Sequence, residues 1–199
     1  MDLGFLLDPL QFAFMQRALL AVILIGLVSG VVGSYVVVRG MAFFGDAVAH
    51  GTLPGVAVAY ILGHDLLIGG LVAGVAVAVG MGWLTREGRL KEDTAIGVIF
   101  AGMFALGIAI ISTANSYSVD LTHILFGNVL GVSDHDLIIM AIFGGVVLLT
   151  IVALYKELLI MSFDMSLART LRLPDSVLRL LLLVLLAVTI VASLQTVGI

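Results

Sequence analysis

The sequence contains no cysteine and few charged residues. Of its 199 residues none is Cys, and only 11% are Asp, Glu, Lys or Arg. The missing thiols exclude disulfides, thiolate metal sites and cysteine nucleophiles, so any metal chemistry falls to His, Asp, Glu and backbone oxygens. A soluble domain of this size carries about 25% charged residues. Because 62% of the residues are hydrophobic, the composition predicts an all-α integral membrane protein.

The chain also lacks the motifs of several enzyme classes. Lys91 and Lys156 are each followed by Glu and neither is preceded by Gly, so no G-x-x-x-x-G-K-[ST] phosphate loop is present. No Ser/His/Asp order or pair of carboxylates with hydrolase spacing stands out. The net charge of -4 argues against nucleic acid as a partner. We therefore expect no enzymatic activity, and no ATPase activity, in this chain.

Long apolar runs predict a polytopic bundle of about six transmembrane helices. The expected spans cover residues 17–38, 41–62, 66–84, 94–112, 137–155 and 178–192. Residues 3–16 predict a short interfacial helix and residues 120–131 a re-entrant or interfacial one, because both are too short or too interrupted to cross about 30 Å of hydrocarbon. The basic residues of segments 86–93 and 156–179 indicate that both are cytoplasmic, and the number of crossings then places the amino terminus outside.

The stretch from Met41 to His50 carries the most informative polar residues. Asp46 and His50 are four residues apart, so on a helix both side chains reach the same cation. Ionisable groups within membrane segments are costly and tend to mark ion routes. Pro54 follows one turn later and predicts a break that frees backbone carbonyls near this pair. The alternative is structural: Asp46 as a helix N-cap and His50 as a hydrogen-bonding group in the bundle.

Other polar clusters have weaker functional interpretations. Asp120 and His123 are three residues apart and form a second candidate for the cation path. His64 beside Asp65 is better explained as a solvated turn. The run from Ser133 to Asp136 looks like a metal cluster but is typical of a capped helix start.

A short amphipathic helix is predicted in the cytoplasmic segment after the fifth span. Asp164 is its expected N-cap, and the helix ends before Pro174. Such a helix suits docking of a soluble partner, and an ordinary solvated surface helix is the alternative interpretation.

Several of these stretches together resemble the membrane permease subunit of the ABC-type zinc and manganese importers, the ABC-3 family. The matching pieces lie in order along nearly the whole chain: Gly33 to Arg39, Met41 to His50 (the pattern GDAxAH), Asp120 with Leu125 to Gly127, and Phe163 to Pro174. The resemblance implies one permease domain, residues 1–199, with the type II ABC importer fold, in the cytoplasmic (inner) membrane of a prokaryote.

The resemblance also implies partners and site residues. It implies a permease dimer, two cytoplasmic ATP-binding subunits and an extracytoplasmic metal-binding protein, with membrane lipid around the bundle and no permanently bound cofactor. Zinc or manganese, or iron, is then the transported substrate, and Asp46 and His50 are associated with metal in the path. The coupling helix of the family falls on residues 164–173. The residues expected to contact the ATPase are Phe163, Asp164, Leu167, Ala168, Leu171 and Leu173.

Two departures accompany the resemblance. Arg172 stands where the family commonly has Gly. Family members also continue past the equivalent of Val197 through further membrane helices, so we expect a chain truncated at its carboxyl end. Two other functions stay open: an ABC permease for a metal chelate such as a siderophore or cobalamin, and a membrane remnant that transports nothing.

Overall fold

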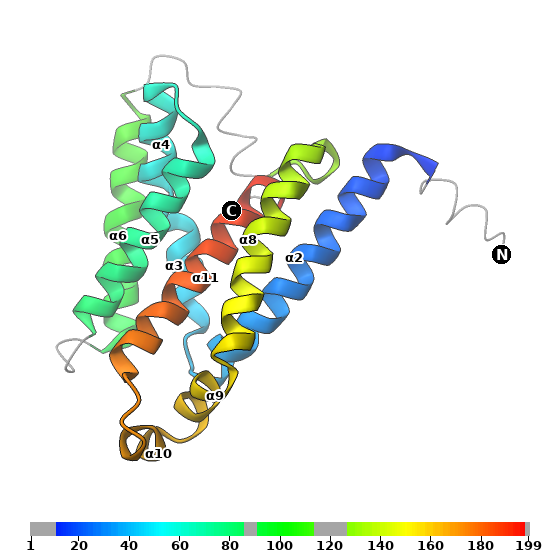
Figure 1. Ribbon diagram of the computed structural model, residues 1–199. Helices are drawn as coiled ribbons and strands as arrows, with labels where there is room; N and C mark the ends of the chain where they lie inside the picture. The colour runs from blue at the N-terminus through cyan, green and yellow to red at the C-terminus, as the bar shows by residue number, and fades with distance from the viewer. Residues whose placement is uncertain (1–10, 86–90, 114–126, 198–199) are drawn as a thin grey trace, which may run out of the picture.

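A computed structural model of the chain describes residues 11–85, 91–113 and 127–197, and all regular structure within these ranges is helical (Figure 1). The elements are α2 (Ala13–Val38), α3 (Ala42–Gly51), α4 (Leu53–Leu62), α5 (Leu66–Leu84), α6 (Glu92–Ile111), the 3-10 turn η3 (Val129–Gly131), α8 (Asp134–Ala153), α9 (Tyr155–Phe163), α10 (Met165–Thr170) and α11 (Asp175–Val197).

The predicted membrane bundle is confirmed. Five of the described helices are long and apolar enough to cross a membrane: α2, α5, α6, α8 and α11. Helices α3 and α4 follow in series from Ala42 to Leu62 with a break at Thr52, over the segment predicted as the second span. This break is where Pro54 predicts it, because Pro54 has no amide hydrogen to donate to the His50 carbonyl.

The amino-terminal prediction is wrong in one respect. Residues 13–16 belong to α2, which continues without interruption to Val38, so they form no separate interfacial helix. The rest of that predicted helix, up to residue 10, lies outside the described residues, and so does most of the predicted re-entrant segment 120–131. Within that segment the described part contains only η3, whose preceding Asn128 accepts a hydrogen bond from the Gly131 amide at 2.9 Å.

Helix α11 is the centre of the bundle. It packs on α5 and α3 on one side and on α2 and α8 on the other (Figure 1). Half of the residues in its most apolar stretch are buried, against 22% to 39% in the other four long helices. Leu182 and Leu183 are almost completely buried there, and most of the large apolar side chains on the outside of the bundle are available to lipid.

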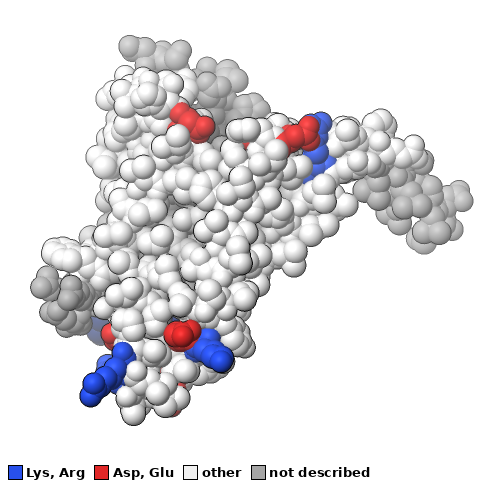
Figure 2. Space-filling view, viewed as in Figure 1, with Lys and Arg blue, Asp and Glu red and all other residues white. Residues whose placement is uncertain are grey.

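Basic residues gather at one end of the bundle. All the described Lys and Arg residues except Arg17 lie at the end that carries α9 and α10, drawn at the bottom of Figures 1 and 2. Arg17 lies at the opposite end, 3.5 Å from the carboxylate of Asp134. By the positive-inside rule the end with α10 faces the cytoplasm. The path of α2 then starts on the outer side, as the sequence predicts.

Candidate metal site and coupling helix

Asp46 and His50 lie on one face of α3, as their spacing predicts. The His50 Nδ1 atom is 3.6 Å from Asp46 Oδ1 and 3.2 Å from the Asp46 carbonyl oxygen. In the tautomer with its proton on Nδ1, the ring donates to that carbonyl and Nε2 keeps the lone pair that a metal requires. The N-cap interpretation of Asp46 is wrong, because α3 begins four residues earlier, after Met41.

The two side chains differ in their surroundings. The Asp46 side chain is 65% exposed on the surface of the chain, whereas that of His50 is 27% exposed. The imidazole lies beside two rings of α6, with its centroid 5.2 Å from that of Phe100 and 5.5 Å from that of Phe104. The two phenyl rings are nearly parallel, at 2°. These rings restrict the orientation of His50 and exclude water from one of its faces.

A cavity of about 240 Å³ opens beside the Asp46 carboxylate, between α3 and α6. Its lining consists of Phe43, Asp46, Ala47, Ile96, Gly97 and Phe100. A methyl group added at Gly97, which lines this cavity, would meet nothing within 4 Å. The cavity is large enough for a hydrated metal ion, which would have the carboxylate as its charged ligand.

The pair supplies at most two protein side chains to a metal. Among the described residues no group of three or more His, Cys, Asp and Glu side chains is close enough to hold an ion. The weaker candidates, Asp120 and His123, lie outside the described residues. Asp65 is explained as the cap of α5, because its Oδ1 accepts from the Leu67 amide at 2.8 Å. Ser133 and Asp136 form a capping box at the start of α8, as predicted.

Glycine contacts fix the broken helix next to α5 and α6. A Cβ atom at Gly55 of α4 would lie 2.2 Å from the Gly69 carbonyl oxygen of α5. A Cβ at Gly107 of α6 would lie 2.8 Å from Leu53 Cβ and 3.1 Å from the Pro54 nitrogen. Backbones approach this closely only where side chains are absent. The contacts therefore hold the segment after His50 against α6, whose aromatic rings face the imidazole.

The short helix predicted after Asp164 is present as α10 (Met165–Thr170). Asp164 caps it, with Oδ1 accepting from the Leu167 amide at 2.9 Å. At its carboxyl end the Arg172 amide donates a hydrogen bond to the Arg169 carbonyl, and the Leu173 amide donates one to the Ala168 carbonyl, both at 3.0 Å. This is the Schellman arrangement, which requires a left-handed residue at its centre. Arg172 takes that conformation, with φ 55°, where glycine would be unstrained.

The six residues expected to contact the ATPase fall into two groups. Phe163, Leu167 and Leu171 are exposed by 73%, 43% and 52%, and Asp164 is also exposed. Ala168 is fully buried and Leu173 is half-buried, so these two attach α10 to the bundle and present little surface to another molecule. Among the expected contact residues, the apolar ones open to a partner are therefore Phe163 at the end of α9, Leu167 of α10 and its C-cap Leu171.

Phe100, Phe104 and Gly97 were not singled out in the sequence. The two phenylalanines are four residues apart on α6, the same spacing as Asp46 and His50 on α3. This periodicity places each pair on one helix face, but it does not tell which two faces meet. The cavity beside Gly97 likewise depends on how α3 and α6 pack.

Comparison with known proteins gives a consistent family. The model of the ABC 3 transport family matches residues 11–199. A manganese transport system membrane protein, MntC, of Halalkalibacterium halodurans is 44% identical over the whole chain and 68% of its own length. A probable iron transport system membrane protein of Haemophilus influenzae is 43% identical over 98% of the chain and 71% of its own length.

A solved structure agrees with the fold. The structure titled PsaBC from Streptococcus pneumoniae in complex with Fab superposes with a TM-score of 0.83 at 43% identity. The match covers 99% of this chain and 71% of that one. The overall arrangement of the chain is thus that of a known fold.

Proposed function

This chain belongs to the ABC 3 transport family of multi-pass proteins of the cytoplasmic membrane, and on that premise we propose that it is the permease subunit of an importer of divalent metal ions. The observation that carries the proposal is the Asp46 and His50 pair on one face of α3, with Asp46 lining the open cavity between α3 and α6. The names of the relatives favour manganese or iron as the substrate. Zinc binds the same two ligand types and stays in the substrate class on chemical grounds.

In the proposed mechanism the ion is held only briefly. A complete four-ligand site would retain the ion too strongly for release in each cycle, whereas one carboxylate and one imidazole leave several positions to water or to other ligands. Because the Asp46 side chain is exposed, a second permease copy that packs on this face of α3 supplies a further ligand in this proposal. Transport then follows from alternating access, with the cavity open to one side of the membrane at a time.

Energy for transport enters through partner chains. ATP hydrolysis belongs to separate cytoplasmic subunits, which dock on the exposed apolar residues of α10 in this proposal. The metal is delivered on the outer side by an extracytoplasmic binding protein. The experiment that tests the function is uptake of Mn²⁺, Fe²⁺ and Zn²⁺ into vesicles that hold the permease with its ATPase and binding protein. ATP-dependent uptake of a free ion is expected; ATP hydrolysis with uptake of a metal chelate alone would contradict the proposal.

Filling the cavity beside Asp46 is expected to slow transport without unfolding the chain. The side chain of a Gly97→Val variant enters open space, so stability is expected to change by less than about 1 kcal/mol. In this proposal the added methyl groups reduce the space that the ion and its water need. We expect uptake to fall by more than about tenfold, the range reported for disturbed metal-site surroundings. Gly102→Val, also on α6 and in open space, is the control; equal loss in both variants would contradict the role of the cavity.

Placing a charge on the apolar surface of α10 is expected to weaken ATPase binding. A Leu171→Asp variant removes an exposed apolar anchor, and loss of such an anchor costs about 2 kcal/mol, or about 30-fold in Kd. The measurement is the affinity of the purified ATPase subunit for the permease. Ser166→Asp adds the same charge to an exposed polar position of α10 and is the control. If the Leu171→Asp variant bound the ATPase subunit with unchanged affinity, α10 would not be the docking site.

A further inference from the structure

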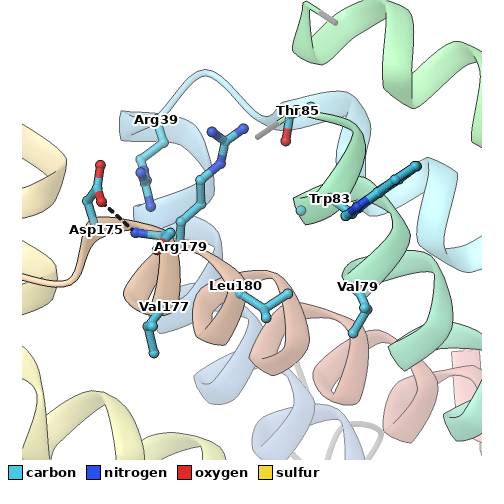
Figure 3. Close-up of a pocket in the computed structure, with 10 residues that line it drawn as sticks. Arg39, Val79, Trp83, Thr85, Asp175, Val177, Arg179 and Leu180 are labelled. Atoms are coloured by element: carbon cyan, nitrogen blue, oxygen red, sulfur yellow. Dashed lines mark hydrogen bonds between the residues drawn. The ribbon is translucent and has the colours of Figure 1, made fainter. Parts of the chain in front are cut away.

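A second pocket, of about 420 Å³, lies at the cytoplasmic end of the bundle, away from the metal site. It is formed where α2 and α5 end and α11 begins (Figure 3). Its lining consists of Arg39, Val79, Gly82, Trp83, Thr85, Asp175, Ser176, Val177, Arg179 and Leu180. Helix α10 contributes none of the described lining residues, so this pocket is distinct from the surface proposed for the ATPase.

Positive charge dominates the described lining. The side chains of Arg39 and Arg179 lie between Asp175 and Trp83, although they come from opposite parts of the chain (Figure 3). The carboxylate of Asp175 lies beside them, and its Oδ1 accepts from the Ser176 amide at 2.8 Å. Guanidinium groups bind phosphate oxygens through parallel N–H donors. Two guanidinium groups in one pocket therefore favour a ligand with a phosphate group over a purely apolar one.

The rest of the lining matches a lipid molecule. Trp83 is 60% exposed and Val177 is 61% exposed, and Val79 and Leu180 extend the apolar wall along α5 and α11 toward the membrane interior. Tryptophan prefers the level of lipid headgroups, where its ring is between apolar and wet surroundings. A ligand in this pocket therefore meets cations at the cytoplasmic surface and apolar side chains just below it.

We propose that the pocket formed by Arg39, Arg179 and Trp83 binds the phosphate headgroup of an anionic phospholipid of the inner leaflet. Basic pockets between transmembrane helices on the cytoplasmic side are the usual sites for such headgroups. The bound lipid joins the end of α2 to the start of α11, the central helix. The proposal does not depend on which metal, if any, the permease moves.

Trp83 makes the test direct because it is the only tryptophan in the chain. The permease is reconstituted in bilayers that contain either brominated phosphatidylglycerol or brominated phosphatidylcholine, and quenching of Trp83 fluorescence is followed. The wild type is expected to be quenched by the anionic lipid at a several-fold lower mole fraction. An arginine contributes on the order of fivefold to this preference and Asp175 opposes it, so an Arg39→Gln/Arg179→Gln variant is expected to lose the preference for the anionic lipid.

Two further variants separate binding from misfolding. Asp175→Asn keeps the oxygen that accepts from Ser176 but removes the carboxylate charge, so it is expected to increase the preference for the anionic lipid. A misfolded pocket would not produce such a gain. Arg169→Gln removes an exposed charge at the same end of the bundle outside the pocket and is expected to leave the preference unchanged.

Three results would overturn the proposal. Equal quenching of the wild type by both lipids would exclude headgroup selection. If inorganic phosphate alone then changed Trp83 emission, and the double arginine variant did not respond, the pocket would belong to a soluble phosphate. If addition of the ATPase subunit alone caused that arginine-dependent change, the pocket would belong to a protein partner.

Discussion

Replacing Gly55 by alanine is expected to destabilise the bundle more than any other single methyl addition described here. The new Cβ would lie 2.2 Å from the Gly69 carbonyl oxygen and 2.6 Å from Ala73 Cβ, so α4 and α5 have to separate along their backbones. Overpacking of a core typically costs about 1 to 3 kcal/mol. The cost here is expected at or above the upper end of this range, because the new Cβ meets the backbone of Gly69, which cannot move aside as a flexible side chain can. The separation also moves the segment that follows His50.

The measurement for this variant is thermal unfolding of the purified protein, with the fraction that stays dispersed in detergent as the readout. Gly145→Ala is the matched control, because a methyl group there meets nothing within 4 Å. The control is expected to melt at or slightly above the temperature of the wild type, since alanine has a higher helix propensity than glycine, and the same gain applies to Gly55→Ala. A Gly55→Ala variant as stable as Gly145→Ala would mean that α4 and α5 do not approach as described.

The second large effect is expected at the metal site. Asp46→Asn keeps the shape of the side chain but removes its charge, and His50→Ala removes the imidazole. Because the described part of the chain offers the ion no third side chain at this place, either change leaves at most one ligand. We expect each variant to lose ATP-dependent metal uptake by more than about 100-fold, beyond the effect of disturbing groups that only support a ligand.

Matched controls exist two and three residues beyond the end of α4. His64→Ala and Asp65→Asn make the same chemical changes in the turn before α5, where both residues are exposed. Asparagine retains the oxygen that caps α5 at the Leu67 amide, so that helix is preserved. Uptake by these two variants is expected to match the wild type. Full uptake by Asp46→Asn and His50→Ala, with normal assembly, would remove the pair from the path.

The sequence predicts those features that depend on residues close together in the chain. Apolar runs define the membrane helices, Pro54 defines the break between α3 and α4, and Ser133 and Asp164 are found as caps. These signals are local, because a helix span, a kink or a cap needs only a few consecutive residues. The same holds for Asp46 and His50, whose common face follows from helix periodicity alone.

Features that depend on packing between distant segments were not predictable. The rings of Phe100 and Phe104 reach His50 only because α6 packs on α3, and Arg39 meets Arg179 only because α11 returns to the end of α2. The unusual Arg172 was visible as a departure from the family. Its consequence, a left-handed residue in the turn after α10, needed the backbone.

The most direct test of the account is pulsed electron paramagnetic resonance of Mn²⁺ bound to the reconstituted transporter. The unpaired electrons of Mn²⁺ couple to the nitrogen of a coordinated imidazole, so the spectrum reports a histidine ligand without requiring transport. We predict a nitrogen coupling in the wild type and in His64→Ala, and its loss in His50→Ala. A coupling that persists in His50→Ala, or that disappears in His123→Ala instead, would contradict the assignment of the metal site to Asp46 and His50.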